Sequence, residues 1–188
     1  MTKMNRTSAR SQRGASLFVA LVMMIAITLI GIAGATISTS EERMARNARD
    51  TNIALQAADA ALRDAEADIV TARAISGATL FSTSCDYTGG KGLCIPPSTG
   101  TAQAWESHLT DPARSLAYGE MTGVPSFIAG TSSGGVSSPP RYLVEAIPDT
   151  SGTSLKAGGS VRYVYRITSV GYGALAGTEV LLQEFFRP

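Results

Sequence analysis

Two cysteines and one histidine carry most of the chemistry that this 188-residue sequence could offer. Cys85 and Cys94 close a loop of about ten residues, and an oxidising compartment would favour a disulfide between them that adds about 2.5 to 3 kcal/mol of stability. Two free buried thiols are the alternative. Because His108 is the only histidine, the chain offers too few nitrogen and sulfur ligands for zinc, and we expect no metal site.

No residue pattern predicts catalysis. The run Gly89-Gly90-Lys91-Gly92 suggests a phosphate loop, but the first glycine of that motif would fall at Cys85, and no Ser or Thr follows Lys91. No serine lies in a Gly-x-Ser-x-Gly sequence, and neither cysteine has an evident activating base. We expect His108 at the surface or at a domain boundary. The sequence therefore predicts a protein that is not an enzyme and has no cofactor.

A long uncharged segment lies near the N-terminus. Residues 14–40, which number 27, contain no charged side chain, and a helix of that length can cross a bilayer. Four basic residues and no acid precede it, so the N-terminal end should stay in the cytoplasm. These residues are Lys3, Arg6, Arg10 and Arg13. The chain after about residue 37 is then expected on the other side of the membrane.

Three kinds of N-terminus fit this segment. A signal peptide could be cleaved after Ala35, since Ala33-Gly34-Ala35 is an acceptable site, although the apolar core from Ala15 to about Ile32 exceeds the usual signal-peptide length. An uncleaved anchor fits the hydropathy equally well. The third possibility is cleavage at Gly14, which would leave the apolar helix on the mature protein.

The stretch Gln12-Arg-Gly-Ala-Ser-Leu-Phe-Val-Ala-Leu-Val22 resembles the start of a type IV prepilin. The resemblance implies that a prepilin peptidase cuts after Gly14 and that the new N-terminus, Ala15, is methylated. Most members of the family have a glutamate five residues into the mature chain. This sequence has Val19 there, which is characteristic of PilX minor pilins and of their pseudopilin counterpart GspK. The C-terminal runs 163–173 and 180–184 also resemble the end of PilX sequences.

The resemblance to PilX implies a minor pilin that takes part in type IV pilus assembly, in the complex at the filament tip. It implies insertion in the bacterial inner membrane with the C-terminal domain in the periplasm, followed by incorporation into the pilus. The implied partners are other minor pilins, the major pilin, the prepilin peptidase and a large tip adhesin of the Y type, in a system for cell adhesion and twitching motility. The alternatives are a type II secretion pseudopilin and a soluble periplasmic binding domain released by cleavage after Ala35.

The charge balance excludes nucleic acid as a partner. The chain has a net charge of +1, and residues 1–14 carry four basic side chains and no acidic one, so their removal leaves 1 − 4 = −3. A mildly acidic protein lacks the basic surface that binds phosphate backbones.

Apolar residues continue at helical spacing after the membrane segment. They form one predicted stripe: Ile37, Met44, Ala48, Leu55, Leu62, Ala65 and Ile69. We expect one helix from Ala15 to about Ile75, ended at Ser76-Gly77, with two separate helices as the alternative. Gly31 and Gly34 mark a bend or a close helix contact. Asp64 and Asp68 lie one turn apart, where we expect them on the solvated face.

The rest of the chain predicts a small sheet. Residues 76–140 are rich in loop-forming residues, with a short helix over Thr101–Leu109 whose Trp105 and Leu109 face the core. Strands are expected at Arg141–Ile147, Val161–Val170 and Thr178–Phe186. The predicted class is α+β, with a long N-terminal transmembrane and amphipathic helix packed on an antiparallel sheet. Its segments are a leader (1–14), a membrane and assembly half (15–36), an amphipathic half (37–75), the loop-rich region (76–140) and the sheet (141–188).

Overall fold

The computed structural model describes residues 15–98, 100–127, 135–149 and 161–188. The predicted leader, with Gly14, lies outside the described residues. Helix α1 runs from Ala15 to Ala67 without interruption. Contacts divide the chain after Arg46 into two compact units.

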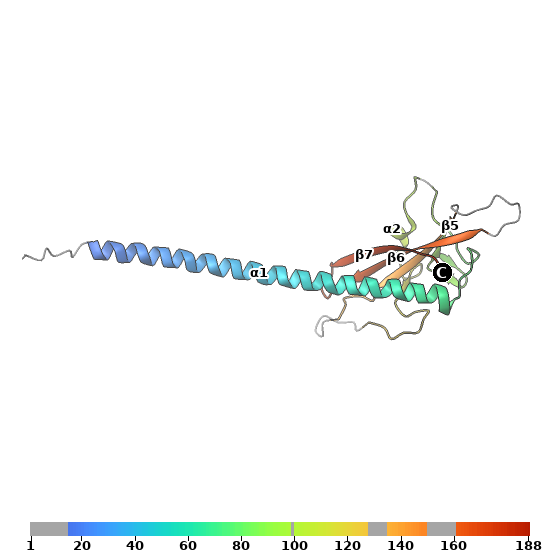
Figure 1. The fold of residues 1–188 in the computed structure, drawn as a ribbon, viewed down its shortest axis with the longest axis horizontal. Helices are drawn as coiled ribbons and strands as arrows, with labels where there is room; N and C mark the ends of the chain where they lie inside the picture. Colours follow the sequence, from blue (N-terminus) through green and yellow to red (C-terminus); the bar gives the residue numbers. More distant parts are fainter. Residues whose placement is uncertain (1–14, 99, 128–134, 150–160) are drawn as a thin grey trace, which may run out of the picture. The chain divides into compact units, whose positions relative to one another are not determined.

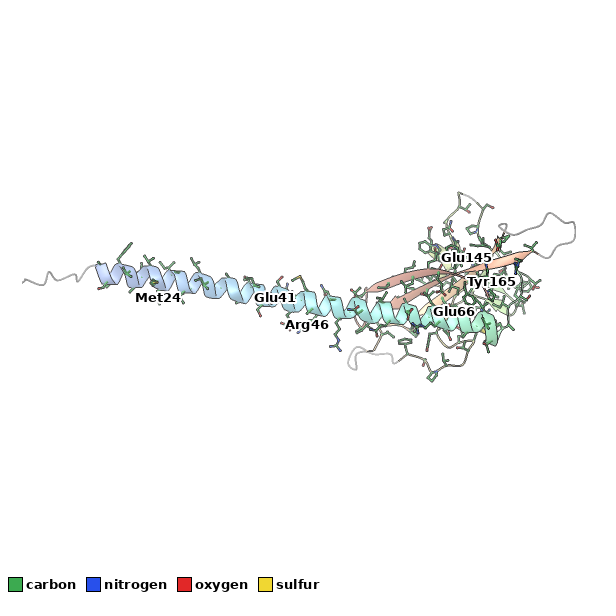
Figure 2. The ribbon with its side chains drawn as sticks, in the orientation of Figure 1. Met24, Glu41, Arg46, Glu66, Glu145 and Tyr165 are labelled. Atoms are coloured by element: carbon green, nitrogen blue, oxygen red, sulfur yellow. A yellow bond between two sulfur atoms is a disulfide. The ribbon has the colours of Figure 1, made fainter. Side chains whose placement is uncertain are left out.

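The first unit is the N-terminal part of α1, and every described side chain in it is exposed. Figure 2 shows side chains such as Met24 and Glu41 projecting from this stretch of helix. The charge-free sequence fits the helical state because its apolar residues are mostly good helix formers, with Gly31 and Gly34 the only glycines in the helix.

In the second unit α1 ends earlier than the sequence predicts. It passes at Asp68–Ala72 into one turn of π-helix, in which the Arg73 N–H donates to the Asp68 carbonyl at 3.0 Å. Ala74, with φ 45°, then turns the chain away, and the Ile75 N–H donates back to the Ile69 carbonyl at 2.8 Å. The expected stop at Ser76-Gly77 is therefore displaced by a few residues.

The remaining elements are short except for three strands. They are β1 (Asp86–Tyr87), β2 (Gly90–Lys91), β3 (Leu93–Cys94), α2 (Ala104–His108), β4 (Leu116–Ala117), β5 (Arg141–Asp149), β6 (Arg162–Tyr172) and β7 (Glu179–Phe186). The three long strands lie where their alternating residues predict them, each within one or two residues at either end.

The main sheet has the order β3-β5-β6-β7, with β4 also paired to β5. The pairs β5–β6 and β6–β7 are antiparallel and continuous, and Ile167 in β6 lies opposite both Val144 and Glu184. β3 runs parallel to β5, so the sheet is mixed. Figure 1 shows β5, β6 and β7 side by side, with the C-terminal end of α1 along one face. The predicted α+β pilin-like fold is confirmed.

The helix face of the sheet forms the larger core. Side chains from the end of α1 pack there against alternate residues of β5 and β6. The fully buried members include Ala61, Ala65, Tyr142, Val144 and Ile167. The opposite face holds a second cluster, formed by Cys85, Cys94, Ala104, Leu109, Leu143 and Val170. As predicted, Leu109 is buried and Trp105 packs against this core.

The buried face of α1 differs from the predicted stripe. Leu62, Ala65 and Ile69 are buried as expected, but Leu55 is 43% exposed, and the contact is made instead by Ala54, Ala57, Ala58 and Ala61. The reason is the close approach of β6: a Cβ built on Gly171 would lie 2.1 Å from the Ala54 carbonyl oxygen. Only small helix residues fit at that distance, so alanine rather than leucine marks the contact.

Candidate functional site

The N-terminal part of α1 presents a continuous apolar surface. Its large side chains between Leu17 and Ile32 are 47% to 73% exposed, and Val19 is 55% exposed. This helix is long and apolar enough to cross a membrane. The Thr28 hydroxyl donates to the Ile25 carbonyl at 2.8 Å, so it needs no water as a partner. Water-soluble monomers rarely keep so large an apolar surface exposed, so this segment needs lipid or other helices around it.

The predicted processing and flexibility sites fall at or inside this segment. Ala15 is the first described residue, and Gly14 lies outside the described part. At Gly31 and Gly34 the helix is intact, and a Cβ built at either would meet no atom within 4 Å. Bending or close packing at these glycines in an assembled filament stays a prediction.

Two buried aspartates on α1 and a third in the π-helical turn that follows it connect this helix to the rest of the domain. Asp50 and Asp64 are 5% exposed and Asp68 is fully buried. The expectation that Asp64 and Asp68 lie on the solvated face is therefore wrong. Each carboxylate instead binds hydrogen-bond donors on a different segment, which compensates for its removal from water.

Asp50 binds the turn between β6 and β7. Its Oδ1 accepts from the backbone N–H of Ala174 at 2.6 Å and of Leu175 at 3.1 Å. The side chain of Thr178 and these two N–H groups hold the pKa of the Asp50 carboxyl below its ordinary value. The Asp50 carboxylate thus holds the turn that precedes β7 against α1.

Asp64 binds the segment after β4. The backbone N–H of Gly119 donates to its Oδ2 at 2.7 Å, and the Thr122 hydroxyl donates to Oδ1. Gly119, with φ +79°, allows the backbone to turn close to the helix. A segment without extended secondary structure is positioned in this way by one helical carboxylate.

Asp68 lies at the centre of a network between the π-turn and β5. Arg73 forms a fork with both carboxylate oxygens, with Nε to Oδ1 at 2.8 Å, and its Nη1 also donates to the Lys91 carbonyl at 2.9 Å. The π-turn makes this fork possible because five-residue spacing places residue 73 over residue 68. The Tyr142 hydroxyl donates to Asp68 Oδ2 at 3.0 Å. Burial, and then the nearby Asp68 charge, raise the pKa of Tyr142.

A buried ion pair stands on the opposite face of the sheet. Glu145 in β5 is fully buried, and Arg166 in β6 donates to both of its carboxylate oxygens at 2.8 Å. Arg166 also donates to the Gln103 side chain just before α2, at 2.8 Å. The pair therefore attaches the short helix α2 to the sheet, as the aspartates attach α1.

The two cysteines form a disulfide bridge, which is one of the two alternatives that the sequence allowed. Cys85 and Cys94 are disulfide-bonded with their Cα atoms 4.5 Å apart, and both residues are fully buried. The bridge closes the loop that carries β1 and β2 and joins it to β3. Gly89-Gly90-Lys91-Gly92 lies within this loop, where Lys91 Nζ pairs with Glu120 at 2.5 Å.

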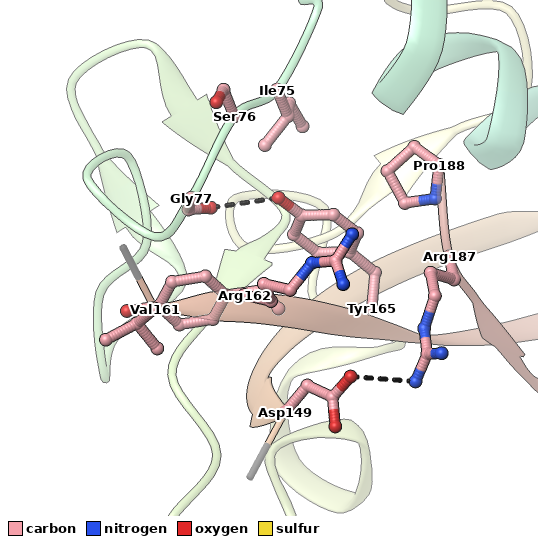
Figure 3. Close-up of a pocket in the computed structure, with 10 residues that line it drawn as sticks. Ile75, Ser76, Gly77, Asp149, Val161, Arg162, Tyr165, Arg187 and Pro188 are labelled. Atoms are coloured by element: carbon pink, nitrogen blue, oxygen red, sulfur yellow. Dashed lines mark hydrogen bonds and ion pairs between the residues drawn. The ribbon is translucent and has the colours of Figure 1, made fainter. Parts of the chain in front are cut away.

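A small pocket lies where β6 begins and the chain ends (Figure 3). It has a volume of about 240 Å³ and is lined by both polar and apolar groups. Arg187 pairs with Asp149 at 2.9 Å, and the Tyr165 hydroxyl donates to the Gly77 carbonyl at 3.1 Å. These bonds fix the C-terminus and the segment after α1 against the sheet. Within the described residues, no three His, Cys, Asp or Glu side chains are grouped to hold a metal ion.

Two family models match the chain at its two ends. The model described as PilX N-terminal matches residues 13–63. The model described as type IV pilus assembly protein PilX C-term matches residues 90–188, more than half of the chain. The chain belongs to the PilX family of type IV pilus assembly proteins. No curated protein and no solved structure matches it.

Membership in the PilX family gives the described features a context. The N-terminal match includes Ala15, Val19 and the exposed apolar part of α1. The C-terminal match includes β2 to β7 and thus the whole main sheet. As a PilX protein, the chain interacts with other components of the pilus. Neither match singles out individual contact residues.

The role of the aspartates in this PilX domain was not predicted from the sequence, although a signal was present. Asp50 and Asp64 are 14 residues apart, close to four helical turns, and Asp68 follows one turn later. All three are in phase with the alanines that pack on the sheet. Charged residues in phase with a buried face, rather than between its members, indicate buried carboxylates that need partners.

Proposed function

We propose that this PilX-family protein is a minor pilin: a non-catalytic structural subunit of the type IV pilus. The observation that carries the proposal is that α1 is one continuous helix, apolar and exposed in its N-terminal part and buried in the domain core near its C-terminal end. Such a helix joins a lipid-soluble or bundle-forming segment to a folded domain. Subunit packing rather than chemistry then performs the function.

The proposed life of the subunit begins in the inner membrane. The apolar part of α1 spans the bilayer with the basic leader in the cytoplasm and the domain in the periplasm, as the position of the basic residues favours. The prepilin peptidase cleaves after Gly14, and Ala15 becomes the methylated N-terminus. The helix then leaves lipid and enters a bundle of like helices in the filament.

Val19 supports a place at the filament tip. In pilins the glutamate at this position is thought to offset the N-terminal amine of the neighbour nearer the tip, since an unpaired charge in an apolar bundle is costly. A subunit at the distal end has no such neighbour and needs no acid. We propose that the chain belongs to the complex that initiates assembly, with other minor pilins, the major pilin and a large tip adhesin of the Y type as partners. Adhesion and twitching motility would then depend on it indirectly.

The tip position is tested by the number and location of subunits. The proposal expects few copies per filament, labelling by immunogold at one end, and a severe loss of surface pili when the gene is deleted. Pili should partly return when retraction is also disabled, because an initiation defect is relieved when the few filaments that form are not withdrawn. Even labelling along the filament would contradict the tip position.

The two alternatives differ in where the helix ends up. A type II secretion pseudopilin would share the processing site and the fold, and deletion would then affect secretion rather than pili. A soluble periplasmic domain would require cleavage after Ala35. The structure has α1 unbroken through that position, so the cut would fall inside a helix. This continuity supports retention of the apolar segment.

A further inference from the structure

Strand β7 ends the main sheet. Among the strands that the structure describes, it pairs with β6 alone, through eight consecutive residue pairs from Glu179 to Phe186. The register has no bulge. A regular strand at the end of a sheet presents a row of unpaired backbone N–H and C=O groups, which another extended segment can bind.

The sequence of β7 protects such an edge only with acidic side chains, one of which, Glu184, faces α1. It contains no proline, lysine or arginine. On the face away from α1, Leu181 is 44% exposed and Phe185 is 66% exposed. Their β6 partners in the register are Val170, which belongs to the second core cluster, and Arg166. The cluster therefore ends at Val170 beside Leu181, and the side chains of Leu181 and Phe185 stay exposed.

The charged residues of β7 are both acidic, and one of them faces α1. Glu184 lies opposite Ile167 on the helix side, and its Oε1 is buried with no hydrogen-bond partner among the described residues. Burial, and then the charges of Glu66 and Asp59 on α1, raise the pKa of Glu184. Arg63, one helical turn after Asp59, pairs with that residue at 3.0 Å and is largely exposed. Within the described part of the chain, Glu184 thus lies near two carboxylates and forms no ion pair.

This acid restricts which segment can pair with β7. An apolar strand would remove Glu184 further from water without compensation, and a second copy of β7 would add more carboxylates. A strand with a basic side chain in the right place would supply the missing cation and a donor for Oε1.

We propose that the free edge of β7 binds an extended segment of another pilus protein, with a lysine or arginine opposite Glu184 and apolar residues opposite Leu181 and Phe185. Because side chains alternate along a strand, the two apolar residues are four positions apart and on one face, and the basic residue is directly next to the one opposite Phe185. This inference rests on the proposed function as a pilus subunit, which supplies such neighbours.

The experiment uses the full chain in cells that make the pilus. The photo-crosslinking amino acid benzoylphenylalanine replaces Phe185, or in the matched control Tyr87, which is 54% exposed in the disulfide loop. Mass spectrometry of the adduct then identifies the cross-linked peptide. We expect an adduct at Phe185 and none at Tyr87, within a peptide that has a lysine or arginine directly beside the cross-linked residue.

Exchanging the charges of Glu184 and of its basic partner tests whether the captured segment pairs with β7 or only lies near it. Glu184→Lys should lower the adduct yield at Phe185 about tenfold or more, because like charges across an interface cost several kcal/mol. Changing the basic residue of the captured segment to glutamate should restore it. Glu184→Gln, which keeps the shape of the side chain, should give an intermediate yield. Trp105 fluorescence and the absence of free thiols check that each variant is folded.

The outcomes distinguish this inference from the proposed function. If deletion of the gene abolishes pili but the Phe185 probe gives no more adduct than Tyr87, the edge-strand proposal is wrong and the pilin proposal stands. The edge-strand proposal is also wrong if the yield of the Phe185 adduct does not change in Glu184→Lys. If deletion leaves pili unchanged, the proposed function fails.

Discussion

Tyr142 and Asp68 lie 74 residues apart in the chain, and the Tyr142 hydroxyl donates a hydrogen bond of 3.0 Å to a carboxylate oxygen of Asp68. Both residues are fully buried, and the same carboxylate binds Arg73 through two nitrogens. A buried ion pair with a further donor joins the last turn of the long helix to a central strand. The network fixes where α1 stops and how the sheet meets it.

Removing the Asp68 carboxylate should destabilise the domain strongly, and removing the Tyr142 hydroxyl should destabilise it moderately. Asp68→Asn leaves the Arg73 charge buried without its counter-charge, and we expect about 3 to 5 kcal/mol of destabilisation. Tyr142→Phe leaves the Asp68–Arg73 pair in place and should cost about 1.5 kcal/mol. Urea unfolding of the detergent-solubilised chain, followed by fluorescence of Trp105, the only tryptophan, measures both.

The matched control is Asp59→Asn, which removes an acid from the exposed surface of the same helix. Its pair with Arg63 is exposed to solvent on both sides, so the change should cost less than about 0.5 kcal/mol. Equal effects of Asp68→Asn and Asp59→Asn would show that the buried network does not stabilise the domain.

Gly171→Ala should push α1 away from β6. The added Cβ would lie 2.1 Å from the Ala54 carbonyl oxygen and 2.3 Å from the Ala58 nitrogen, both backbone atoms that cannot move aside independently. We expect a loss of about 3 kcal/mol in the same unfolding measurement. Gly34→Ala, whose Cβ would meet no atom within 4 Å, should not lower the midpoint, because alanine favours a helix over glycine by about 1 kcal/mol. A neutral Gly171→Ala would mean that helix and strand are further apart than described.

The disulfide should contribute a modest stability. Cys94→Ser should lower the unfolding free energy by about 2.5 to 3 kcal/mol, since it opens a loop of about ten residues in the unfolded chain. The double variant Cys85→Ser, Cys94→Ser should lose a similar amount, because the second thiol has no bridge left to form. Thiol labelling of unfolded, unreduced wild-type protein should find no reactive cysteine. Two alkylated thiols would refute the bridge.

Glu184 should make the domain more stable as the pH falls. Its folded pKa is raised, so the neutral form is favoured in the folded state, and the charged form opposes folding near neutral pH. Lowering the pH from about 7 to about 5 should therefore raise the free energy of unfolding of the domain. The gain from Glu184 should be less than about 1 kcal/mol, because this side chain is partly exposed. Glu184→Gln should be more stable at pH 7 and should flatten the profile. An unchanged profile in Glu184→Gln would contradict this assignment.

The alternation of apolar and polar residues in the strands, and the length of the uncharged N-terminal segment, made much of the fold predictable. Apart from Val164, the run Val161 to Ile167 alternates apolar and polar residues, and β6 begins within it at Arg162 because one face of the strand meets the core. The membrane segment was predictable from the absence of charged side chains over 27 residues alone. Short strands such as β3 have no such pattern, since two residues cannot show a period, and their pairing depends on the disulfide and the loop around it.

The carboxylates were not predictable from residue type alone. An aspartate on an amphipathic helix is usually solvated, and Asp64 and Asp68 are buried only because Gly119, Thr122, Arg73 and Tyr142 come from distant segments to meet them. Leu55 was expected in the buried stripe and lies outside it, because the contact with Gly171 admits only small side chains. A periodicity count does not include the contact that excludes Leu55, and it can show that the aspartates share the buried face but not which groups meet them.

The most direct test of the account is the mass of the mature N-terminus. If the chain is a processed minor pilin, mass spectrometry of protein from the cell envelope should find a chain that starts at Ala15 with a methylated amine. Gly14→Arg should leave the uncut precursor in the inner membrane, because the peptidase needs a small residue at the cut. A mature chain that starts at Thr36 would contradict the account, since it would lack the apolar helix on which assembly depends.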